Sequence, residues 1–141
     1  MADAKSAAIN RLPESAEQRL SGLNRSRAGT AEWHLEIAQR LIHLATDLAT
    51  EAKTASVRPI AERALHNTVL AERLAQKPDL RAAAKTMTGF IQDRFLGDRR
   101  AALLSYREAA QLSPKAHQAQ HQEANLGLWL AREEQKGGPR P

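Results

Sequence analysis

Residues 97–114 have the sequence GDRRAALLSYREAAQLSP, which carries the clearest structural signals in the chain. Gly97 suits the left-handed conformation that closes a helix, and the Asp98 carboxylate can accept hydrogen bonds from the first amides of the next helix. Pro114 stops that second helix and can start another. The stretch therefore predicts a tight turn between two helices.

The helix after this turn carries a face built for close packing. Ala102, Tyr106 and Ala109 follow one another at spacings of four and three residues, so they lie on the same side. The small residues allow another helix to approach closely, and the ring fills the space between them. We expect this face to pack against the preceding helix.

The whole run resembles the second half of a tetratricopeptide repeat, a helical hairpin of about 34 residues. The matching positions are Gly97, Ala102, Tyr106, Ala109 and Pro114. Residues 88–90 (TGF) are the nearest candidate for the first-helix motif of the repeat, but they lie one position out of register. Residues 125–129 (NLGLW) resemble the first helix of a following unit. The resemblance covers residues 80–137 and implies stacked hairpins that bind other proteins. The broken first-helix register prevents a transfer of the family's peptide-binding residues.

Capping residues and apolar spacing divide the rest of the chain into helices. Thr30 caps a long helix that reaches about residue 53, and a second helix runs from Val57 to about residue 76. Asp79 caps a third helix, Asp98 a fourth, and Ser113 starts a fifth. Short connections imply antiparallel neighbours. The predicted fold is all-α, an antiparallel helical-hairpin array or bundle of about five helices with a repeat-like C-terminal half; a bundle that merely contains one such hairpin fits equally well.

Three parts make up the predicted domain organisation. Residues 1–29 form a flexible N-terminal arm with one short helix from Glu14 to Leu23, because Pro13 can begin that helix and two glycines follow it. Residues 30–136 form a single helical domain, and residues 137–141 form a disordered tail.

Composition limits the range of functions. The chain of 141 residues contains no cysteine, which excludes a disulfide framework and a thiolate nucleophile and is consistent with a cytoplasmic location. No apolar stretch approaches the roughly 18 residues of a membrane span, so no membrane partner is expected. The sequence shows no acids and bases that helical spacing would bring together, and it shows no phosphate-binding loop. We therefore expect no enzyme activity and no cofactor.

Three of the histidines lie at positions that suit a special role. His117 and His121 have the four-residue spacing of helical metal ligands, but a third ligand on the same face is missing, so no metal site is expected. His34 lies within the apolar arc of the long helix, where a histidine usually finds a hydrogen-bond partner.

Positive charge is concentrated in residues 77–115, which hold eight of the chain's 21 lysines and arginines against four acids. Such a surface suits an acidic partner. We therefore expect a non-catalytic interaction or adaptor module that binds an acidic or amphipathic segment of another protein, or a second copy of the chain. The predicted partner-binding residues are Arg81, Lys85, Gln92, Arg100, Leu104, Arg107 and Trp129.

The alternative is a small basic accessory protein that binds DNA or RNA. Arginine and lysine that neutralise phosphates provide affinity independent of sequence, although stacking aromatics and a clear helix-turn-helix are missing. The residues predicted for this alternative are Arg11, Arg19, Arg25, Arg27, Arg81, Lys85, Arg99 and Arg100.

Overall fold

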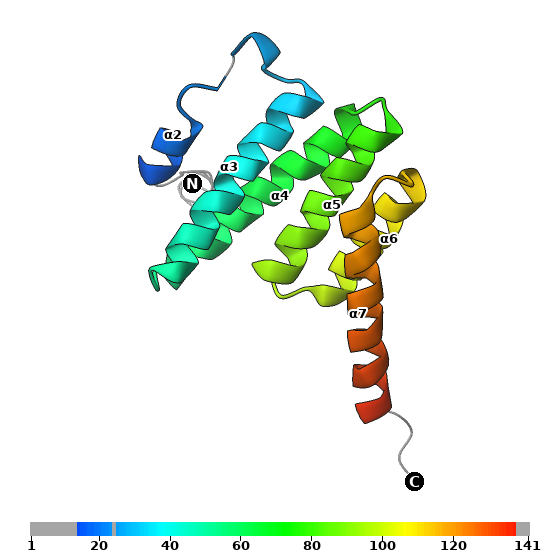
Figure 1. Ribbon diagram of the computed structural model, residues 1–141. Coiled ribbons are helices and arrows are strands. Elements are labelled where there is room, and N and C mark those ends of the chain that lie inside the picture. The colour runs from blue at the N-terminus through cyan, green and yellow to red at the C-terminus, as the bar shows by residue number, and fades with distance from the viewer. Residues whose placement is uncertain (1–13, 24, 138–141) are drawn as a thin grey trace, which may run out of the picture. The chain divides into compact units, whose positions relative to one another are not determined.

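The computed structural model describes residues 14–23 and 25–137, and within them the chain is helical with no strand (Figure 1). The α-helices are α2 (Glu14–Leu20), α3 (Ala31–Thr50), α4 (Val57–Leu74), α5 (Pro78–Arg94), α6 (Arg99–Leu112) and α7 (His117–Lys136). Short 3-10 helices occupy Arg25–Arg27 and Thr54–Ser56. The predicted all-α array is confirmed, and the five main helices lie close to their expected positions.

Contacts between Cα atoms divide the chain into two compact units, residues 1–75 and 76–141, which are described separately below. The helical domain predicted over residues 30–136 spans both units. Residues 1–13 and 24 of the predicted N-terminal arm and residues 138–141 of the predicted tail lie outside the described residues. Among the helices that are described, none is both long and apolar enough to cross a membrane.

The first unit is a helical hairpin with a short helix beside it. In Figure 1, α3 and α4 run antiparallel along each other, and α2 lies against α3. The middle of α3 buries Leu41 and Leu44, and the adjoining helices bury Ile60 and Ala16. This arrangement matches the wide apolar arc of the α3 sequence, because α3 has two helical neighbours.

Both ends of α3 have recognisable signals. Thr30 is the N-cap as predicted, and its hydroxyl accepts a hydrogen bond from the amide of Trp33 at 3.2 Å. The C-terminal end comes three residues earlier than expected, at Thr50. Ala52 takes a left-handed conformation there (φ +62°), and the amide of Lys53 bonds back to the carbonyl of Leu48 at 2.9 Å. This is the geometry of a helix C-terminus that normally uses glycine.

His34 has the polar partner that its position predicted. Its Nδ1 lies 2.9 Å from Oδ1 of Asn67 on α4, and the Asn67 side-chain amide donates to the carbonyl of Arg63 at 2.9 Å. Asn67 is buried, so these bonds satisfy an amide that would otherwise be costly inside the hairpin. The pair links α3 to α4.

The second unit consists of α5, α6 and α7, with α6 packed against both of the others. Gly97 is in the left-handed region (φ +67°), and Asp98 Oδ1 accepts a hydrogen bond from the amide of Ala101 at 3.1 Å. Both features were predicted from the sequence. They produce the sharp turn between α5 and α6 that is visible in Figure 1.

The predicted packing face of α6 forms the centre of this unit. Ala102, Tyr106 and Ala109 are all buried, and Leu103 and Leu126 join them in one apolar cluster. Burial raises the pKa of Tyr106 to about 12, with Asp93 acting in the same direction and Arg94 opposing it. The tyrosine is therefore a structural side chain, sealed from solvent.

Two predicted caps were wrong. The N-cap of α5 is Lys77, and Asp79 lies inside the first turn, where its carboxylate accepts a hydrogen bond from the Ser113 hydroxyl at 2.6 Å. Ser113 does not start α7, which begins at His117 after the N-cap Ala116. Both polar side chains are used instead to tie the end of α6 to the start of α5, a contact between residues 34 positions apart.

Candidate interaction surface

The exposed side of α6 carries a continuous stripe of four residues, Arg100, Leu104, Arg107 and Gln111. Their spacings of four, three and four residues place them on one helical face, opposite the buried alanines and Tyr106. Leu104 is 55% exposed, one of the few large apolar side chains so open to solvent among the described residues. We call these four residues the α6 stripe.

Contacts to α5 fix one edge of the α6 stripe. Lys85 Nζ lies 2.5 Å from Glu108 Oε2, and the Ser105 hydroxyl donates to Gln92 Oε1 at 2.7 Å. Lys85 and Gln92, both predicted to meet a partner, are thus engaged with α6 and partly covered. Arg81 lies on the same helix and is exposed.

Contacts to α7 fix the other edge. Arg107 Nε lies 3.3 Å from Glu123 Oε1, which links the stripe to α7. The guanidinium of Arg99 lies 5.0 Å from the ring centroid of Trp129 and 3.5 Å from Asp93 Oδ1. The predicted anchor Trp129 is therefore covered on one face by an arginine, in a cation–π contact.

These contacts change the charge of the surface that the sequence suggested. Lys85, Arg99 and Arg107 each have a carboxylate partner. Arg81 and Arg100 have no ion pair with another of the described side chains and are exposed. The surface is thus mildly basic, with an apolar side chain at the centre of the stripe.

The three acids that pair with these bases, Asp93, Glu108 and Glu123, were not predicted as part of the site. Each of these acids lies on a different helix from the base with which it pairs, so the spacing within one helix cannot connect the two residues. The one useful signal in the sequence is the apolar pattern of α6 and α7. Aligning the two helices by that pattern could have indicated that Arg107 lies near Glu123.

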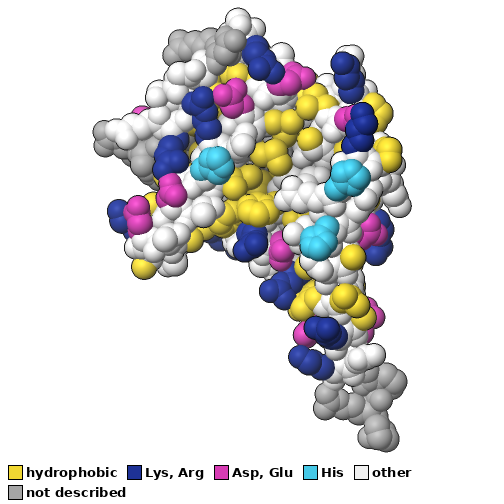
Figure 2. Space-filling model, viewed as in Figure 1, with side chains coloured by type: hydrophobic (Ala, Val, Ile, Leu, Met, Phe, Trp, Pro, Cys, Tyr) yellow, Lys and Arg dark blue, Asp and Glu magenta, His cyan; other side chains and the backbone are white. Residues whose placement is uncertain are grey.

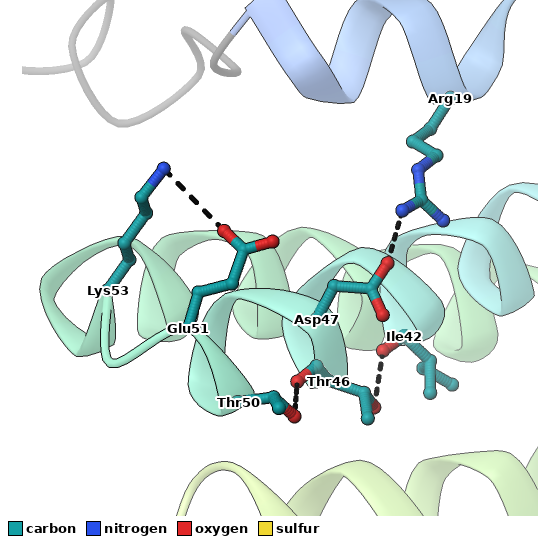
Figure 3. Close-up of polar contacts among 7 residues, drawn as sticks. All are labelled: Arg19, Ile42, Thr46, Asp47, Thr50, Glu51 and Lys53. Atoms are coloured by element: carbon teal, nitrogen blue, oxygen red, sulfur yellow. Dashed lines mark hydrogen bonds and ion pairs between the residues drawn. The ribbon is translucent and has the colours of Figure 1, made fainter.

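The residues of the nucleic-acid alternative are distributed over both units. Arg19 on α2 forms an ion pair with Asp47 of α3, close to the side-chain-to-backbone bonds of Thr46 and Thr50 (Figure 3). Arg27 is exposed at the end of a 3-10 helix. Arg25 begins that helix, and Arg11 lies outside the described residues. Arg81, Lys85, Arg99 and Arg100 belong to the second unit.

The outward face of α7 carries the histidine pair. His117 and His121 are both exposed, and Figure 2 shows two histidine side chains over the first part of α7, with apolar and basic side chains further along. Within the described residues, no three or more His, Cys, Asp or Glu side chains are grouped so that they could hold a metal ion.

Comparisons with protein-family models, with curated proteins and with solved structures found no match for this chain.

Proposed function

We propose that the chain is a non-catalytic interaction module that binds an acidic or amphipathic segment of another protein through the α6 stripe. The observation that carries the proposal is Leu104, 55% exposed between Arg100 and Arg107 on the same face. An apolar side chain with an arginine on either side along the helix can supply a desolvated anchor, while the arginines attract and orient acidic groups.

The rigidity of the three-helix unit supports this role. Interhelix contacts on both sides of the α6 stripe hold its backbone in place, so little conformational entropy is lost when a partner binds. The tight α5–α6 hairpin is also what the resemblance to tetratricopeptide repeats led us to expect, and a protein-binding role is in line with that resemblance. The proposal includes a cytoplasmic location, which the cysteine-free sequence favours.

A binding assay with matched variants tests the proposal. Immobilised wild-type protein, the stripe variants Arg100→Glu and Leu104→Ser, and the control Arg58→Glu would be exposed to a nuclease-treated extract of the source organism. Arg58 is an exposed arginine of the first unit that pairs with Glu62. A partner of the α6 stripe should bind wild type and the control, and be lost from both stripe variants.

The nucleic-acid alternative gives a different result. Binding through phosphate contacts should weaken by orders of magnitude between about 50 and 200 mM salt and should not depend on Leu104. In a separate assay with added DNA and RNA fragments and no nuclease, binding by wild type that is lost equally from the Arg100→Glu and Arg58→Glu variants would contradict the proposal. The raised pKa of Tyr106 provides a check that each variant keeps its hairpin.

A further inference from the structure

A cavity of about 410 Å³ opens on the second unit, away from the residues of the α6 stripe. One wall is the first half of α5, and the other is formed by the α6–α7 connection and the first turn of α7. Its volume lies within the range of about 300–1,000 Å³ that is typical of small-molecule sites.

The cavity has mainly apolar walls. Ala82, Ala83 and Met87 line it from α5, and Ala116 and Ala119 line it from the other side. The short alanine side chains create the space, because the backbones on both sides carry no larger group to fill it. A guest therefore meets methyl and thioether surfaces, which favour an aliphatic or aromatic body.

The two hydroxyl groups of the walls are already bonded to the protein. The Ser113 hydroxyl donates to Asp79 Oδ1 at 2.6 Å and accepts from the amide of Lys115 at 3.2 Å. The Thr86 hydroxyl donates to the carbonyl of Ala82 at 2.8 Å. A polar body placed inside would find few free partners, and burying it would be costly.

The α7 side of the opening carries a lysine that can meet a negative charge, although the Asp79 carboxylate competes for it. The Lys115 side chain is 82% exposed, and its Nζ lies 3.8 Å from Asp79 Oδ2, a loose contact from which it can turn to a ligand. His117 lies beside it on the cavity wall. The first turn of α7 has no side-chain cap, so the positive end of the helix adds to the charge of Lys115.

We propose that this cavity binds a small organic anion with an apolar body, such as an aliphatic carboxylate. The body lies between the alanines and Met87, and the carboxylate lies at Lys115. The residues of this site are separate from the α6 stripe, so a test of the cavity does not depend on whether the stripe binds a protein partner.

Methyl NMR of Met87 tests the proposal directly. The chain has two methionines, Met1 and Met87, and a Met87→Leu variant assigns the signal in the cavity wall. The probes share one tail and differ in the head group: hexanoate, hexanamide and hexylammonium, with acetate as the probe that lacks the tail. We expect hexanoate to shift the Met87 methyl signal most strongly, hexanamide less, and acetate not at all.

Substitutions separate the two parts of the site. Ala83→Leu should narrow the cavity and weaken the shift strongly. Lys115→Gln should weaken hexanoate about two- to fivefold, the effect of one exposed charge, and leave hexanamide unchanged. Asp79→Asn should strengthen hexanoate, because it removes a competing carboxylate and keeps an acceptor for Ser113. Lys136→Gln, at the far end of α7, is the control and should change nothing.

Three outcomes would overturn the proposal. The first is no shift of the Met87 signal up to the solubility limit of hexanoate. The second is an equal shift in the Ala83→Leu variant, which would place the probe elsewhere. The third is a preference for hexylammonium over hexanoate, which would reverse the assigned charge.

Discussion

Gly89 of α5 lies directly against the ring of Tyr106 of α6. A Cβ atom added at Gly89 would be 2.9 Å from Cε1 of the ring, closer than real Cβ atoms approach, and 3.0 Å from Cδ1. Only glycine allows the two helices this separation while the ring stays buried. The hairpin that presents the α6 stripe is therefore set by one glycine and one tyrosine.

Gly89→Ala should destabilise the protein by about 1–3 kcal/mol, the usual cost of overpacking, although alanine is the better helix former. The matched control is Gly127→Ala in α7, where an added Cβ meets nothing within 4 Å. That change should stabilise by about 0.5–1 kcal/mol. Urea unfolding of both variants measures the difference. Equal effects would show that the ring does not restrict position 89.

Tyr106 is the only tyrosine, so phenolate absorbance reports its ionisation without interference from another residue. The folded protein should ionise with a pKa of about 12, and the unfolded protein near 10.0. The pKa of Tyr106 is higher in the folded protein than in the unfolded protein, so burial of the neutral phenol contributes to the free energy of unfolding. This contribution is fully present below the unfolded pKa and is lost as the pH rises through the folded pKa. A single transition near 10.0 in native buffer would mean that the ring is accessible to solvent.

The Lys85–Glu108 ion pair should stabilise the contact between α5 and α6. Lys85 is 19% exposed at its side chain, so the pair is less screened than a surface pair. A double-mutant cycle with Lys85→Gln and Glu108→Gln should give a coupling of about 1 kcal/mol. The same cycle on the exposed pair Arg58–Glu62 should give about 0.3–0.5 kcal/mol. Comparable couplings for the two pairs would rule out a special role for Lys85.

Ala52→Gly should stabilise the first unit. Ala52 has φ +62° at the end of α3, a conformation that costs a residue with a Cβ about 1 kcal/mol and glycine almost nothing. Thermal unfolding should show the gain, and Ala49→Gly inside α3 should show a loss of similar size. A loss at both positions would mean that the left-handed conformation is not occupied in solution.

Local signals predicted most of the fold. Thr30, Gly97 and Asp98 act within a few residues of themselves, and all three have the predicted role. The predictions for Asp79 and Ser113 were wrong because a contact across 34 residues competes with helix capping, and local spacing cannot reveal such a contact.

The site was predicted less completely than the fold. Helical spacing identified the exposed face of α6, since Arg100, Leu104 and Arg107 lie where a helix of that register must place them. It did not show that Lys85 would meet Glu108 or that Arg99 would cover Trp129, because these contacts depend on how the helices are aligned along each other. The cavity beside Met87 depends on the same alignment.

Photo-crosslinking from position 104 can show whether the α6 stripe binds a protein partner. A benzophenone side chain would replace Leu104 in one protein and the exposed His43 of the first unit in another, and both would be irradiated in extract of the source organism. We predict one protein adduct from position 104, abolished by an added Arg100→Glu and retained with Arg58→Glu, and no such adduct from position 43. The same adducts from both positions, or adducts to nucleic acid alone, would contradict the claim that the α6 stripe binds a protein partner.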